Sequence, residues 1–152
     1  MGIQADDLFR IFNYGVLPFW LLLVFLPQAR ITTTLVHSAV MPCVLGVAYT
    51  VLLAVSIASA SPDAPGLDFG SIEGIRAGFQ SDTALLAGWI HYLAFDLFVG
   101  AWCCRDAART GVPHVVVIPV LILVLMAGPA GLLLYLVVRG VWKRRFTLRE
   151  AD

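Results

Sequence analysis

The chain has 152 residues, with ten Lys and Arg balanced by ten Asp and Glu, and 60% of its residues are hydrophobic. Its mean hydropathy of +0.89 and its 13% of charged residues exclude an ordinary soluble domain. The zero net charge excludes the broad positive field of a nucleic-acid-binding protein. The apolar blocks have the length of membrane spans, about 20 residues each. We therefore predict an all-α integral membrane protein that forms a single domain.

The first predicted span covers residues 9–27, and Pro18 within it predicts a kink. The residues before it do not resemble a signal peptide, because Asp6 and Asp7 stand where basic residues are expected. A second span is predicted over residues 35–60.

The longest connection follows the second span. Ser-Pro-Asp-Ala-Pro-Gly at its start breaks regular structure, and apolar residues then recur at roughly helical spacing. We predict a short amphipathic helix over residues 67–80 that lies in the membrane interface, with Glu73 and Arg76 among its polar residues.

The third predicted span, residues 83–104, holds two ionisable side chains, His91 and Asp96. A charged side chain near the bilayer centre costs about 3 kcal/mol or more, so it seldom occurs there without a role. Asp96 is too deep and too short to reach the headgroups, so we expect it to face protein, a cavity or a ligand. This helix is the first place to look for function.

The fourth predicted span, residues 114–138, is interrupted by Pro119 and by the pair Gly128 and Pro129. Its length fits one kinked crossing, and two half-helices that meet at Gly128 are the alternative. The residues before it, 105–113, are expected to form a solvated polar turn that can hold an internal ion pair.

Four spans would place both termini on one side of the membrane. The basic tail, residues 139–152, then shares its side with Arg10 and Arg76, which gives seven Lys and Arg against three on the other side. The positive-inside bias predicts cytoplasmic termini, and we expect a bacterial inner-membrane protein. The tail residues, Arg139 included, are expected to set topology and to contact anionic lipid.

Aromatic side chains follow Asp96 along two stripes of the third predicted span. One stripe contains Trp89, Tyr92, Asp96 and Gly100, and the flanking stripe contains His91, Phe95, Phe98 and Trp102. This density of rings beside a buried acid suits a flat or polyene-like apolar ligand. The alternative is a tightly packed helix in which Asp96 bonds to Tyr92 or to a neighbouring hydroxyl. The predicted ligand-binding residues are Trp89, Tyr92, Phe95, Phe98 and Trp102.

Haem is the cofactor to test, because membrane helices often supply paired His ligands. His37 and His91 are expected to differ in depth by about 15–20 Å, at a rise of about 1.5 Å per residue, which is too far to share one iron. We therefore predict no cofactor and no metal, with a single-His haem as the alternative. Cys43, Cys103 and Cys104 lack metal-ligand spacing, and small apolar filler is the preferred interpretation over metal binding or a disulfide.

Four stretches between residues 69 and 139 carry a family resemblance. They are Phe69-Gly-Ser-Ile-Glu-Gly-Ile, Leu86-Ala-Gly-Trp-Ile-His-Tyr-Leu-Ala-Phe-Asp-Leu-Phe-Val-Gly, Gly111-Val-Pro-His and Gly128-Pro-Ala-Gly-Leu-Leu-Leu-Tyr. Together they resemble the abscisic-acid-deficient-four family. The resemblance implies an integral membrane protein linked to carotenoids, since plant members are required to make neoxanthin from violaxanthin.

In chemistry of that type, an epoxide opens while a proton leaves the adjacent polyene carbon. Such a step needs an acid at the epoxide oxygen and a base at the carbon. The resemblance thus implies Asp96 as the proton donor and His91 as the base or its partner. Glu73 is the second acid candidate.

Three functions from different classes follow. The leading hypothesis is a protein that binds a carotenoid or related isoprenoid and isomerises it without redox change. The second is a non-catalytic carotenoid- or lipid-binding scaffold for other pigment enzymes. The third is a small transporter that works as a dimer. The expected partners are an apolar ligand such as a carotenoid, membrane lipids and a second copy of the chain.

Overall fold

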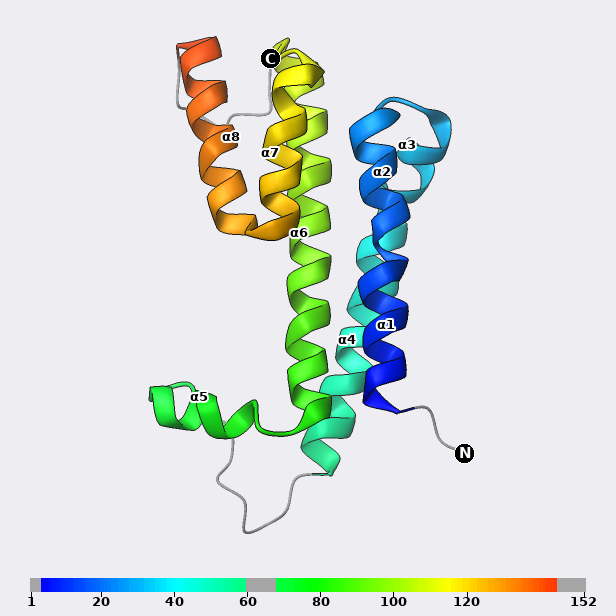
Figure 1. The fold of residues 1–152 in the computed structure, drawn as a ribbon, viewed down its shortest axis with the longest axis vertical. Helices are drawn as coiled ribbons and strands as arrows, with labels where there is room; N and C mark the ends of the chain where they lie inside the picture. The colour runs from blue at the N-terminus through cyan, green and yellow to red at the C-terminus, as the bar shows by residue number, and fades with distance from the viewer. Residues whose placement is uncertain (1–3, 60–67, 145–152) are drawn as a thin grey trace. The chain divides into compact units, whose positions relative to one another are not determined.

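The computed structural model describes residues 4–59 and 68–144, and all regular structure in these ranges is helical (Figure 1). The all-α prediction is therefore confirmed for this part of the chain. Three helical stretches are long and apolar enough to cross a membrane: Ala5–Phe25, Arg30–Ala58 and Asp82–Thr110.

The chain divides into two compact units. The first comprises residues 1–16 and 41–94, and the second comprises residues 17–40 and 95–152. The helices of the first unit are α1 (Ala5–Gly15), nearly all of α4 (Val40–Ala58), α5 (Ile72–Gly78) and the first part of α6 (Asp82–Thr110). The second unit has α2 (Leu17–Phe25), α3 (Arg30–Leu35), the rest of α6, α7 (His114–Met126) and α8 (Gly128–Lys143).

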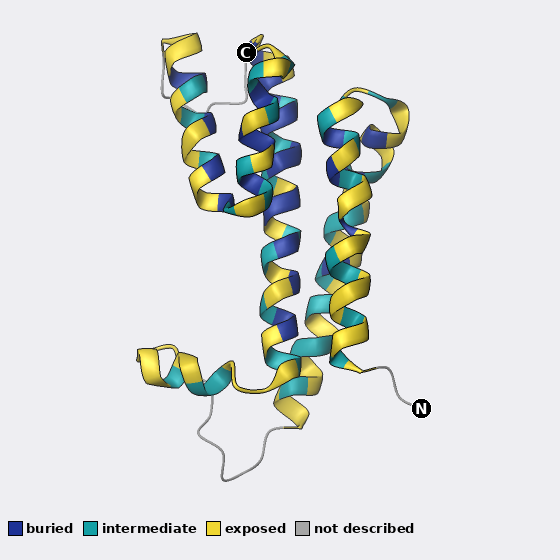
Figure 2. Ribbon diagram, in the orientation of Figure 1, coloured by how far each residue is buried: buried dark blue, intermediate teal, exposed yellow. Residues whose placement is uncertain are grey.

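The core of the second unit consists mainly of buried apolar residues. Buried residues follow the second part of α6 and one side of α7 (Figure 2). Seven of its described residues have no exposed surface, namely Leu23, Thr32, Cys103, Val117, Leu121, Val124 and Tyr135. The hydroxyl of Tyr135 donates to a buried carboxylate described below.

Side chains hold the C-terminal end of α2. The last carbonyls of a helix have no partner within the helix, so they need donors from elsewhere. Two imidazoles and one fully buried hydroxyl supply these donors. The bonds run from His114 to the Val24 carbonyl (2.9 Å), from His37 to the Pro27 carbonyl (2.9 Å) and from Thr32 to the Leu26 carbonyl (2.5 Å). They tie α2 to α3 and to the start of α7.

The apolar stretch after α6 forms a helical hairpin, in which α7 and α8 pack side by side (Figure 1). The backbone leaves the helical region at Ala127, with φ −158° and ψ 76°. Pro129 then lies in the first turn of α8, where its missing N–H leaves no hydrogen bond unmade. Gly131 lets the two helices approach, because a Cβ there would collide with the backbone of Val124. The structure thus differs from the single kinked crossing expected over residues 114–138.

Other boundaries shift by a few residues. The first predicted span contains a break between α1 and α2, so Pro18 is the second residue of α2. α6 continues to Thr110, which makes residues 105–110 helical instead of a turn. α5 falls within the predicted interfacial helix, whose residue 67 lies outside the described residues, as do residue 60 of the second predicted span and residues 145–152 of the tail.

The hairpin suggests a second topology beside the four-span arrangement, which stays a prediction. If only the three long apolar stretches cross a membrane, the termini would lie on opposite sides, because a hairpin returns to the side from which it enters. Eight of the ten Lys and Arg, from Arg30 and from Arg105 onward, then share the C-terminal side, and Arg10 and Arg76 lie opposite. The positive-inside bias now predicts a cytoplasmic C-terminus and an outside N-terminus.

This topology is tested with an epitope tag on each terminus of the full chain in intact bacterial cells. We expect external protease to remove the N-terminal tag and to spare the C-terminal tag until the membrane is permeabilised. Two tags that respond alike would restore the four-span arrangement.

Candidate functional site

Asp96, the acid that the sequence places in mid-membrane, lies against the turn between α7 and α8. A Cβ on Gly128 would collide with the Asp96 carboxylate, so no residue with a side chain fits there without a shift. Both residues are buried, and Asp96 is only 7% exposed. Two of the resembling stretches, in the middle of α6 and at the start of α8, therefore meet at this contact. The amino end of α8, the positive end of its dipole, gives the carboxylate a favourable electrostatic neighbour.

An apolar groove lies between α6 and α8, one helical turn from this contact. Its volume is about 310 Å³, and its walls are Phe98, Val99, Trp102, Leu132 and Leu136. The Trp102 ring packs edge-on against Tyr135, with centroids 5.4 Å apart. Two of the five predicted ligand-binding residues, Phe98 and Trp102, thus gather in one groove. Phe95 is exposed on α6 and does not line it.

The groove is apolar along its length. Asp96 and Gly128 precede its lining residues on α6 and α8, and Asp106 follows them on α6. Ten residues of helix separate the two carboxylates of α6, which corresponds to about 15 Å at a rise of about 1.5 Å per residue. Such an arrangement fits a ligand with an apolar body and an oxygenated end group.

The remaining predicted aromatics belong to the first unit. The rings of Trp89 and Tyr92 stack with centroids 5.2 Å apart, and Trp89 also lies 5.7 Å from the ring of Phe9. The indole Nε1 of Trp89 donates to the Asn13 side chain at 3.2 Å. The contacts of Trp89 pack α6 against α1, and a role of Trp89 and Tyr92 in ligand binding stays a prediction.

His91 also lies on the first-unit part of α6, where its ring faces Tyr49 of α4 at 5.6 Å. Asp96 belongs to the second unit, whereas His91 belongs to the first. The pocket expected to be shared by His91, Tyr92 and Asp96 stays a prediction.

Glu73 lies in an exposed local network at the start of α5. Its carboxylate pairs with Arg76 at 3.0 Å, and the two side chains are 82% and 65% exposed. The Ser71 hydroxyl caps the helix by accepting from the Gly74 amide. Hydrogen bonds from the Gly70 amide and from the Ser71 hydroxyl hold the pKa of Asp68 below its usual range. The resembling stretch around Glu73 is therefore used to begin a helix.

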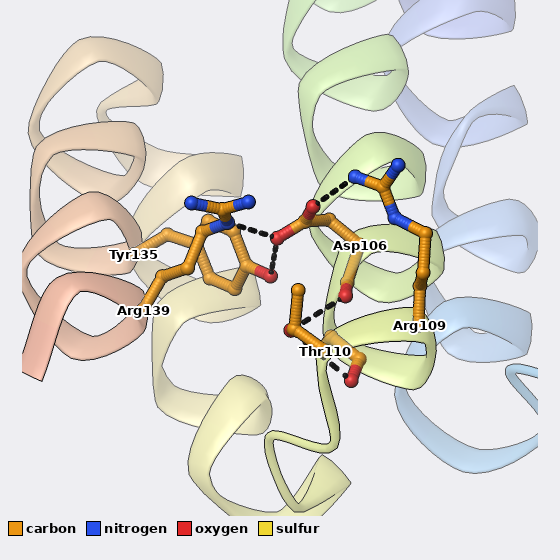
Figure 3. Close-up of polar contacts among 6 residues, drawn as sticks. Asp106, Arg109, Thr110, Tyr135 and Arg139 are labelled. Carbon is orange, nitrogen blue, oxygen red and sulfur yellow. Dashed lines mark hydrogen bonds and ion pairs between the residues drawn. The ribbon is translucent and has the colours of Figure 1, made fainter. Parts of the chain in front are cut away.

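Asp106, near the end of α6, is a buried carboxylate that accepts from three side chains (Figure 3). One oxygen accepts from Arg139 Nε at 2.6 Å and from the Tyr135 hydroxyl at 2.7 Å, and the other accepts from Arg109 Nη2 at 2.6 Å. Thr110 donates to the backbone carbonyl of Asp106 at 2.7 Å. Asp106 is 2% exposed and Arg139 is 5% exposed. We call these five residues the Asp106 cluster.

The Asp106 cluster corrects two expectations. The polar residues after the third predicted span do not form a solvated turn, because Asp106 is buried in α6, although the internal ion pair is confirmed. Arg139, expected in the tail as a topology signal, is buried within α8. One sequence signal was available: Arg139 stands among apolar residues, Val138 and Gly140 beside it, whereas Lys143 begins a basic run.

The described residues contain no group of three or more His, Cys, Asp and Glu that could hold a metal ion. The three cysteines are free thiols, and Cys103 and Cys104 are buried. The Cys104 thiol lies 3.9 Å from the Leu23 carbonyl, as a small side chain that packs α6 against α2. A single-His haem stays a prediction to be tested.

Comparison with known proteins places the chain in a family. The family model of ABA DEFICIENT 4-like proteins matches residues 7–135. The chain belongs to the ABA DEFICIENT 4-like family. Protein ABA DEFICIENT 4, chloroplastic, from Arabidopsis thaliana is 34% identical over 108 residues. The aligned part covers 67% of this chain and 48% of the relative, so the chain spans about half the length of that protein. No solved structure matches the chain.

The contact between Asp96 and Gly128 gives a first prediction for this ABA DEFICIENT 4-like protein. Gly128→Ala should destabilise the folded state by about 1–3 kcal/mol, because the added methyl displaces a buried carboxylate. Removing that carboxylate in the Asp96→Ala, Gly128→Ala double variant should cost less than the two single changes together. Unfolding of the purified protein in detergent measures this difference. Gly46→Ala is the control, because a Cβ there meets no atom within 4 Å. Equal effects at the two glycines would contradict the steric argument.

A second prediction concerns the Asp106 cluster. Asp106→Asn should lower stability by about 3–5 kcal/mol, because it leaves Arg139 buried without its counter-charge. Arg139→Gln should cost a similar amount, and the double variant should cost clearly less than the sum. Glu73→Gln, which breaks an exposed ion pair, should change stability by less than about 0.5 kcal/mol. Strict additivity of the two buried changes would show that the residues act separately.

Proposed function

We propose that this ABA DEFICIENT 4-like protein is an integral membrane protein that binds a carotenoid or related isoprenoid in the α6–α8 groove. The observation that carries the proposal is the apolar groove lined by Phe98 and Trp102, beside a helix that also holds Asp96. The family resemblance supplies the class of ligand. The polyene lies along the aliphatic and aromatic walls, and an oxygenated ring lies toward one of the two carboxylates of α6.

We further propose that the bound carotenoid is isomerised without redox change. Asp96 gives a proton to the epoxide oxygen as the C–O bond breaks, and a base takes the proton of the adjacent polyene carbon. The electrons of that C–H bond form the new double bond, so atoms and electrons balance within the substrate. His91 is the candidate base, and Glu73 is the second acid candidate.

The alternative is a non-catalytic carotenoid-binding scaffold. The fit of Asp96 against Gly128 favours this alternative, because the contact gives Asp96 a packing role that needs no chemistry. Both candidate functions place the carotenoid in the α6–α8 groove. Only the isomerase requires a proton from Asp96.

Pigment binding tests the groove. Protein purified from a carotenoid-producing host should carry pigment, and Phe98→Ala should weaken binding about tenfold through lost ring contact. Ile122→Ala, an equally exposed apolar residue on α7 outside the groove, should bind as the wild type does. Equal losses in both variants would place the pigment elsewhere.

Asp96→Asn separates enzyme from scaffold. Asn keeps the size and hydrogen-bonding capacity of Asp while removing the titratable proton, so the variant should fold and bind pigment. Incubation with a carotenoid epoxide such as violaxanthin should then give product with the wild type and none with the variant. Product formed equally by both, with misfolding only in Asp96→Leu, would make Asp96 structural.

A further inference from the structure

The end of the second unit contains a second concavity, separate from the α6–α8 groove. Its volume is about 400 Å³, within the range of small-molecule sites, about 300–1,000 Å³. Polar side chains of the lining are Gln28, Thr33, His37, Arg105 and His114. Small apolar residues form the rest, among them Ala107, Ala108 and Val112. The pocket therefore combines a cation with an apolar wall.

Arg105 supplies the positive charge of this pocket. It is half-buried, and among the described residues no carboxylate lies within ion-pair distance of it. Its Nη1 donates to His37 Nδ1 at 3.4 Å, and the opposite ring nitrogen of His37 donates to the Pro27 carbonyl. This pattern requires a neutral imidazole, so His37 orients the guanidinium without neutralising it.

The charge of the surrounding unit favours an anion. The described residues of the second unit include six Lys and Arg and only two Asp. In the first unit, two Arg stand against five Asp and Glu. Asp106, one of the two carboxylates in the second unit, is already bonded to Arg109 and Arg139. The described residues of the second unit therefore carry four more positive than negative charges.

We infer that the pocket binds a phosphate group carried by a small headgroup, with Arg105 as its principal contact. The guanidinium presents paired N–H donors that match phosphate oxygens. Lining residues come from the end of α6 and from the segments that follow α2 and precede α7, where the apolar helices end. An anionic lipid headgroup fits this position, with its glycerol against the alanines, and a soluble phosphate ester shares the same chemistry.

The test uses the purified full chain in detergent, with native mass spectrometry to count bound lipid and thermal unfolding to report affinity. Short-chain phosphatidylglycerol is the probe, and diacylglycerol with the same chains is its phosphate-free control. Arg105→Gln should weaken phosphatidylglycerol binding about tenfold, since a hydrogen bond to a charged group is lost. Arg30→Gln removes an exposed cation of the same unit outside the pocket and should change affinity less than about twofold.

Two further arms complete the test. Inorganic phosphate and glycerol phosphate are added as competitors: Arg105-dependent competition identifies a soluble ligand, and its absence identifies the lipid. If Arg105→Gln fails to fold, Ala108→Trp fills the pocket from an exposed position and should abolish binding while Arg105 remains. Binding that is unchanged in the folded pocket variants, or lost equally in Arg30→Gln, would overturn the inference.

Discussion

The Asp106 carboxylate, bonded to Arg139, Arg109 and Tyr135, connects the end of α6 to α8. A buried carboxylate costs several kcal/mol unless charges and hydrogen bonds replace its water, and each of its oxygens here has a donor with a positive charge. Because Arg139 must reach Asp106, α8 has to return toward the end of α6 from which α7 departs. The direction of the hairpin and the position of the α6–α8 groove both depend on this pairing.

The same hairpin creates the setting for ligand chemistry. α6 contributes the aromatic walls of the groove, Phe98 and Trp102, and α8 contributes the aliphatic walls, Leu132 and Leu136. The Asp96 carboxylate is fixed by the shape of the turn at Gly128 instead of by an exposed loop. A proton donor or a recognition group held this rigidly costs little reorganisation when a ligand arrives. Binding and catalysis would therefore use the same contact in different ways.

Much of the fold was predictable from local patterns. Long apolar runs indicate helices because a backbone in lipid must satisfy its own hydrogen bonds, and α6 was placed nearly to its first residue. The hairpin was harder, because residues 114–138 have the length of one crossing. The separation into two helices shows in how closely Gly131 packs against Val124. Amino-acid composition does not predict that packing.

The partners of buried polar residues were harder to predict than the residues themselves. Depth and aromatic spacing on one helix singled out Asp96, Phe98 and Trp102, and their part in a ligand site stays a prediction. The role of Arg139 was missed because a single Arg before a basic tail looks like part of the tail, and its partner lies 33 residues away. Pairings over such distances are fixed by tertiary structure, so single-helix periodicity cannot reveal them. His37 was similarly considered as a haem ligand, whereas its ring bonds the Pro27 carbonyl just after α2.

The separation of Asp106 from Arg139 along the chain also has a consequence for biogenesis. A growing chain emerges in order, so Asp106 leaves the ribosome while the 33 residues that end at Arg139 are still to come. Until then its charge has no buried counter-charge from α8, and the end of α6 cannot settle into its final environment. A protein truncated before Arg139 would therefore lose the ion pair that joins α6 to α8, although the three helical stretches long enough to span a membrane had already been made.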